Sequence, residues 1–322
     1  MNDKPFKTFD ELIELLSIRG IDIKTSEAKV YAKNILIRHG YYNVINGYKN
    51  LFLDKTFHPI SDTETGCLIE PIEKYKEGTT INEIYALYEF DRAIRNLFLK
   101  YILKIETHVK NLIAYYFSME YGHNNYLRYN NFNNNVSNAP TKITELIAEI
   151  QRQISSRSND PSISHYLTHY GYVPLWVLNN ILTFGTISKF YSLMKTSERS
   201  AIAKNFSILD KELESELFYI STVRNFCAHG NRLYCYRTKH PLINTSQHDF
   251  FEIEKNSNNE YINGKRDLFA AYIAMKQLLP ANDYKTLKRK ISENLYHLRK
   301  KLVVIKIEDV LSEMGFPKNW KK

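Results

Sequence analysis

The feature that most limits the possible folds is an unbroken helical period that starts at Thr80. Apolar residues recur at helical spacing from Ile84 to Tyr116, and this stretch contains neither glycine nor proline. Thr80 and Glu83 have the spacing of a capping box, in which each side chain accepts a hydrogen bond from the other residue's backbone N–H. The sequence therefore predicts one long helix from Thr80 to about residue 118.

The rest of the chain also shows helical patterns, and only the segment FFEIEKNSNNEYI suggests a small hairpin. Gly20 and Gly40 are placed to end the first two helices. Pro174 is placed to begin a helix through LWVLNNIL, which Gly185 interrupts. Pro280 is placed to stop a later helix. We predict an all-α protein. The other expected helices cover residues 8–19, 26–39, 141–155, 210–229, 266–279 and 283–303.

Composition suggests three consecutive segments. The first, 1–79, is a helical and aromatic segment with a loop that contains Pro59, Pro71 and Gly78. Residues 80–240 form the helical core, and 241–322 add an irregular insertion and C-terminal helices that complete the bundle.

The formal net charge of +9 suggests a polyanionic partner, although the abundance of Lys, Asn, Ile and Tyr is also what AT-rich coding produces. No stretch is apolar enough to span a membrane, and the N-terminus is acidic where a secretory signal would be basic, so we expect a cytoplasmic protein. Three cysteines suit a reducing compartment. Cys227, His229, Cys235 and His240 lack the spacing of zinc ligands, so we expect neither a metal nor another cofactor.

The segment STVRNFCAHGNRL (221–233) contains the most informative residues. On a helical wheel Arg224 continues the apolar stripe of Leu213, Leu217 and Ile220. An arginine there must reach solvent, pair with a carboxylate or face a site. Asn225, His229 and Arg232 are expected to form a second, polar band.

Glu106 supplies a carboxylate for this arginine. It lies among Ile102, Val109 and Ile113 on the apolar side of the long helix, where an unpaired charge is costly. We therefore predict that Glu106 pairs with Arg224 or Arg232. The alternative for His229 is a simple cap at a helix end that Gly230 closes, because a histidine at that end also favours the helix dipole.

The run Arg224-Asn225-Phe226-Cys227-Ala228-His229 resembles the RNxxAH motif of HEPN ribonucleases, in the form found in the bacterial abortive-infection (Abi) family. Further blocks resemble that family in the same order: GYYNVINGYKNLF, YEFDRAIRNLF with the following IE, GYVPLWVLNNILTFGTISKFY, and MGFPKNW. The resemblance therefore extends across most of the chain.

This resemblance implies a HEPN-like helical bundle with extra N-terminal and C-terminal helical segments, a homodimer, and metal-independent cleavage of RNA in phage defence, of the toxin–antitoxin kind. Arg224 and His229 would be the catalytic pair, with Asn225 shaping the motif. Glu106 and Arg232, which the helical pattern singles out, would be supporting residues. Gly230 departs from the family pattern, which often has a second polar residue there. A structured non-coding RNA would be a partner or an inhibitor.

Two further sets of residues are candidates for RNA contact. The helix at 283–303 has a basic face that either binds phosphates or is simply solvated, formed by Lys285, Lys288, Arg289, Arg299 and Lys300. Tyr41, Tyr42 and Tyr48 either stack on bases or fill the edge of the core.

Two other functions share these features. A non-catalytic protein could use Arg224 and His229 only to hold a structured RNA. A regulatory helical dimer in phage defence would bind another protein and no RNA. A magnesium-dependent nuclease is disfavoured, because no acidic cluster stands out as a metal site.

Overall fold

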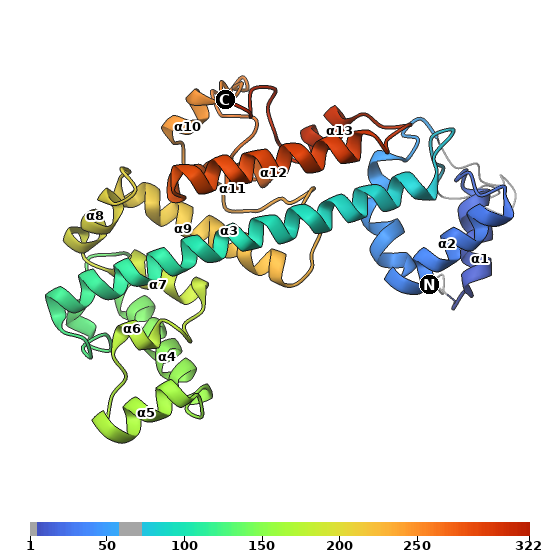
Figure 1. Ribbon diagram of the computed structural model, residues 1–322. Helices are drawn as coiled ribbons and strands as arrows, with labels where there is room; N and C mark the ends of the chain where they lie inside the picture. The colour runs from blue at the N-terminus through green and yellow to red at the C-terminus, as the bar shows by residue number, and fades with distance from the viewer. Residues whose placement is uncertain (1–4, 58–72) are drawn as a thin grey trace, which may run out of the picture. The chain divides into compact units, whose positions relative to one another are not determined.

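A computed structural model describes residues 5–57 and 73–322 (Figure 1). Within these ranges the protein is all-α, as predicted, and no strand longer than an isolated bridge occurs. The expected hairpin is reduced to one antiparallel bridge between Lys255 and Tyr261. No helix in the described ranges combines the length and the apolar character that crossing a membrane requires. Pro59, Cys67 and Pro71 lie outside the described residues.

The chain folds into two compact units, each assembled from separate segments. Unit 1 consists of Met1–Asn96, Arg232–Cys235 and Lys288–Met314, and unit 2 consists of Leu97–Asn231, Tyr236–Leu287 and Gly315–Lys322. The long helix α3 (Ile81–Tyr121) and the helix α12 (Ala281–Arg299) each contribute residues to both units.

Unit 1 begins with α1 and α2, which pack against each other, and ends with α13. Thr8 and Glu11 form a capping box at the start of α1, and Thr25 caps α2. The stretch from Tyr42 folds into a π-helical turn and a 3₁₀ turn. The bounds are α1 Phe9–Ile18, α2 Ser26–His39, π-helix Tyr42–Asn46, 3₁₀ helix Lys49–Leu51 and α13 Ile307–Glu313.

The N-terminus of α3 is built differently from the predicted capping box. Thr80 Oγ1 accepts a hydrogen bond from the Glu83 N–H, as expected. The buried Glu83 carboxylate, however, accepts hydrogen bonds from the backbone N–H groups of Val303, Val304 and Ile305. A local pattern cannot anticipate these partners, because they lie more than two hundred residues further along the chain.

Unit 2 surrounds α9, which packs against α7, α8 and α11. The helix α11 is buried on nearly all sides, in keeping with its almost entirely apolar sequence. The bounds are α4 Ala139–Ser156, α5 Pro161–Tyr170, α6 Leu175–Leu178, α7 Phe184–Leu193, α8 Thr196–Lys204, α9 Asp210–Ala228, α10 Ser246–Phe250, α11 Leu268–Leu278 and a 3₁₀ helix Tyr129–Asn131.

Two helix predictions in unit 2 were wrong. The helix after Pro174 has only four residues, α6. Gly185 does not interrupt a helix but lies inside α7, because Thr183 caps that helix by accepting a hydrogen bond from the Thr186 N–H. The short helices α5 and α8 were not predicted.

Candidate functional site

The buried stripe of α9 leads directly to Arg224. Leu213, Leu217 and Ile220 are fully buried, and Arg224 follows them one turn later with 32% of its side chain exposed. The predicted stripe is therefore present, and its last member is a charged side chain at the edge of the core.

Glu106 lies beside Arg224, as predicted. Its Oε2 is 3.4 Å from Arg224 Nε, while Oε1 is 2.8 Å from Lys110 Nζ one turn further along α3. Only 6% of Glu106 is exposed, so an unpaired carboxylate here would be strongly destabilising. Two cations therefore share one buried anion.

Lys110 is itself fixed in place. Its Nζ donates a hydrogen bond to the Leu182 carbonyl at 2.7 Å, and Asn179 Nδ2 donates to the Lys110 carbonyl at 2.6 Å. These contacts connect α3 to the segment between α6 and α7. They hold Lys110, and with it the Glu106 carboxylate, in position beside Arg224.

The outer end of the Arg224 guanidinium remains available. Nε is used by Glu106, whereas neither Nη group has a partner in the described part of the chain. A guanidinium with both Nη groups open can donate two parallel hydrogen bonds to a phosphate.

His229 lies at the end of the same helix. The helix ends at Ala228, and the His229 N–H donates to the Asn225 carbonyl at 3.0 Å. Gly230, with φ of +72°, donates to Cys227 at 3.2 Å, and the Asn231 N–H donates to Phe226 at 3.3 Å. This is a Schellman motif, which favours a glycine in the left-handed region. The His229 side chain is exposed, as is that of Asn225.

The expected polar band does not include Arg232. Because α9 ends at Ala228, Arg232 is not on the helix and belongs to unit 1. There its guanidinium donates to the carbonyls of Asn46 at 3.3 Å and Gly47 at 3.0 Å. Arg232 thus stabilises the turn after Tyr42, and the band prediction was wrong at this residue.

The helix α12 is amphipathic, with one apolar face that is buried and one basic face. Leu287, Ile291, Leu295 and Leu298 are buried. Arg289 pairs with Glu293 at 2.5 Å, and Lys300 Nζ lies 4.3 Å from the centre of the Tyr296 ring. Among the basic candidates Lys288 is half-buried, and the exposed ones are Lys285, Arg289, Arg299 and Lys300.

The three tyrosines considered for base stacking differ in exposure. Tyr48 is buried, stacks on Tyr234 and donates a hydrogen bond to Asp91 at 2.6 Å, and Tyr41 is half-buried beside Arg19. Tyr42 alone of the three is exposed, at 70%. Tyr41 and Tyr48 therefore follow the core-edge alternative.

A family model described as "Abi-like protein" matches residues 34–235, which is more than half of the chain. The chain belongs to this family. The Abi-like match includes Glu106, Arg224 and His229, whereas α12 and its basic residues lie outside it. Membership supports a role in abortive infection and phage resistance. Searches of curated proteins and of solved structures gave no match.

Two residues of this candidate site were missed by the sequence predictions. Lys110 follows Glu106 by four positions, which is the spacing of a helical ion pair and could have been noticed. Asn179 carries no such local signal, because its contact with Lys110 joins segments 69 residues apart.

The described ranges contain no group of three or more His, Cys, Asp or Glu side chains suited to a metal ion. His165 and His169, which were not among the predicted site residues, lie one helical turn apart on α5 with their ring centres separated by 4.7 Å. Two ligands fall short of the three or four protein ligands typical of zinc sites.

Proposed function

We propose that the chain is a metal-independent endoribonuclease of the HEPN type that acts in abortive infection. The observation that carries this proposal is the arrangement of Arg224, whose Nε is held by buried Glu106 while its Nη groups are open, on the same helix end as exposed His229. Membership in the Abi-like family supports the role in phage defence.

The chemistry needs only proton transfer and charge stabilisation. The RNA 2′-hydroxyl attacks the adjacent phosphorus, the bond to the 5′-oxygen breaks, and the products are a 2′,3′-cyclic phosphate and a 5′-hydroxyl. Histidine can accept the proton from the 2′-hydroxyl or give one to the leaving 5′-oxygen. Arg224 would bind the phosphate oxygens as their negative charge develops.

One motif histidine per chain leaves one of the two proton-transfer steps without a group. We therefore include a homodimer in the proposal, in which the second copy supplies its own His229 as the complementary acid or base. The partner is RNA, with a structured non-coding RNA as substrate or inhibitor.

The test is cleavage of total cellular RNA by the purified protein in excess EDTA. Wild type is expected to cut, and His229→Ala to reduce the rate by at least about 100-fold, the usual contribution of general acid–base catalysis. His240→Ala, which alters another exposed histidine of unit 2, is the matched control and should cut at the wild-type rate.

Equal cutting by wild type and His229→Ala would contradict the assignment of the site. Binding of RNA without any product would instead favour the non-catalytic RNA-binding protein, and no binding of RNA would favour the regulatory dimer.

A further inference from the structure

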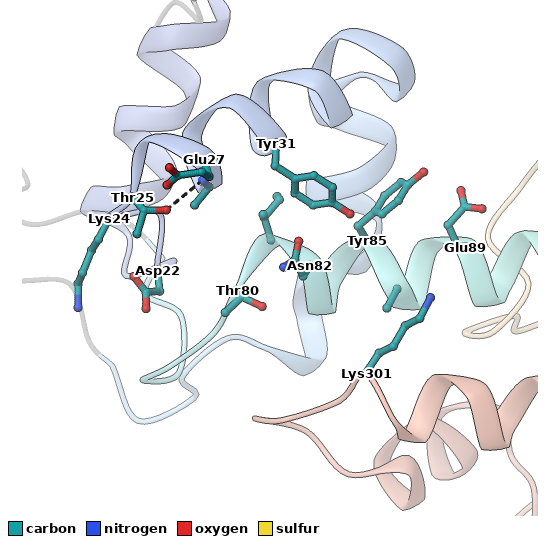
Figure 2. A pocket seen from close by; sticks show the side chains of 13 residues that line it. Asp22, Lys24, Thr25, Glu27, Tyr31, Thr80, Asn82, Tyr85, Glu89 and Lys301 are labelled. Carbon is teal, nitrogen blue, oxygen red and sulfur yellow. Dashed lines mark hydrogen bonds between the residues drawn. The ribbon is translucent and has the colours of Figure 1, made fainter.

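Unit 1 contains a cavity of about 760 Å³ beside the first turns of α2 and α3 (Figure 2). Every residue that lines it belongs to unit 1. Its volume lies in the range of about 300–1,000 Å³ that is usual for small-ligand sites. The lining is mixed, with aromatic and amide side chains in the middle and charged ones around them.

Two tyrosines provide aromatic surface in this cavity. Tyr31 is 43% exposed, and Figure 2 shows its ring next to that of Tyr85. Tyr85 is held in place, because its ring contacts those of His39 and Tyr88 at 5.4 and 5.8 Å and its hydroxyl lies 3.1 Å from His39 Nε2. Tyr31 is thus exposed and Tyr85 half-buried, and an exposed ring beside a fixed one is a surface on which single-strand binders can stack a base.

Asn82 adds a polar group beside the rings. It is exposed, and its amide has no hydrogen-bond partner in the described ranges. A free side-chain amide offers two donors and one acceptor oxygen, the combination that matches the edge of a nucleobase.

The charges are arranged around this centre. In Figure 2, Lys24 and Lys301 stand on opposite sides of Asn82. Of the carboxylates, Glu89 is neutralised by Arg92 at 2.8 Å, which leaves Asp22 and Glu27 to balance the two lysines. Lysines on two sides can contact phosphates along a single strand, and the carboxylates can accept hydrogen bonds from ribose hydroxyls.

We infer that this cavity binds single-stranded RNA, with one base against Tyr31 and Tyr85, the edge of that base at Asn82, and phosphates of the strand at Lys24 and Lys301. The inference rests on the proposed function in that RNA is taken as the substrate. It assigns to unit 1 a binding site separate from the catalytic residues, all of which lie in unit 2.

The experiment measures the binding of a fluorescein-labelled single-stranded hexa-adenylate RNA by anisotropy, with the full chain carrying His229→Ala so that the RNA stays intact. Adding Tyr31→Ala should weaken binding about tenfold, which is the loss expected for one base stack. The control is Tyr170→Ala, which removes a 57% exposed tyrosine of α5 that does not line the cavity and should change binding less than about twofold.

The lysines are tested through salt. Lys24→Ala and Lys301→Ala should each reduce the slope of log Kd against log salt concentration by about 0.7, the value for one phosphate contact on a single strand. Lys29→Ala alters an exposed lysine of α2 outside the cavity and should leave the slope unchanged.

Unchanged binding in Tyr31→Ala, or no binding of the hexanucleotide by the His229→Ala chain itself, overturns the inference. If the cavity accepts a peptide rather than RNA, Tyr31→Ala will leave RNA binding unchanged. If the protein binds RNA through Tyr31 but never cuts it, only the proposed function is overturned. If the protein cuts RNA and Tyr31→Ala binds RNA normally, only this inference is overturned.

Discussion

The behaviour of Arg224 depends on a carboxylate that solvent hardly reaches. Glu106 is placed between Lys110 and Arg224, so its charge is balanced twice. A flexible arginine side chain would lose conformational entropy each time it bound a phosphate. Because Glu106 already holds Nε, part of this loss occurs on folding, and the Nη groups are oriented before RNA arrives.

Glu106→Gln tests this positioning role. The variant keeps the shape of the side chain but loses the charge that attracts Nε, so kcat for RNA cleavage should fall about tenfold while KM changes less than about threefold. Glu120→Gln, an exposed glutamate near the end of the same helix, is the control. A Glu106→Gln enzyme with wild-type kcat would show that Glu106 only neutralises charge in the core.

At the scale of the secondary-structure element, the end of α9 fixes the backbone of His229. The Schellman motif satisfies the final carbonyls through Gly230 and Asn231, and it turns the chain away just after the histidine. This requirement accounts for Gly230 at a position where the resembled family pattern often has a second polar residue.

Gly230→Ala should destabilise the protein by about 1 kcal/mol, because a Cβ is disfavoured at φ of +72° even though no atom lies within 4 Å of its position. Urea denaturation measures this change. Gly185→Ala in α7 is the contrasting variant, since its φ is not positive and its nearest neighbour, Thr183 Oγ1, is 3.9 Å away. Helix propensity predicts no loss there, so equal destabilisation by both variants would contradict the account.

Long elements with a clear period were predictable, whereas short ones were not. The helices α3 and α9 were predicted to within a few residues, and the pairing of Glu106 with Arg224 followed from the rule that a buried charge needs a partner. The helix α5 was not predicted, because its start, Asp160 followed by Pro161, resembles a turn. Contacts between distant segments, such as that of Arg232 with Asn46, leave no local pattern.

At the scale of the whole molecule, the pH dependence of stability depends on the carboxyl group of Asp267, which is buried in unit 2. Asp267 caps α11 and accepts hydrogen bonds from the N–H groups of Gly264 and Ala270. Burial nevertheless raises the pKa of Asp267 from 3.8 to about 6. The folded protein therefore holds this proton more tightly than the unfolded chain.

The sign of the pH effect follows from this raised pKa. The contribution of Asp267 to stability is full below pH 3.8 and is lost as the pH rises through about 6. Between these limits it should lower the free energy of unfolding by roughly 3 kcal/mol. Buried His248, whose pKa burial lowers, acts in the opposite sense, so the effect is isolated by comparison with a variant.

Asp267→Asn keeps an acceptor oxygen but cannot ionise. The difference in unfolding free energy between wild type and Asp267→Asn, measured by urea denaturation at pH 4 and pH 7, should shift by roughly 2 kcal/mol to the disadvantage of wild type at the higher pH, because part of the full effect has already occurred at pH 4. Parallel pH profiles for the two proteins would contradict the raised pKa.

The most direct test of the proposed nuclease is to sequence RNA ends from cells that express either wild type or His229→Ala. The account predicts new ends in the wild-type sample alone, with 2′,3′-cyclic phosphate or 3′-phosphate on one side of each cut and 5′-hydroxyl on the other. Identical RNA ends in the two samples, or cuts that carry 5′-phosphate and 3′-hydroxyl, would contradict it.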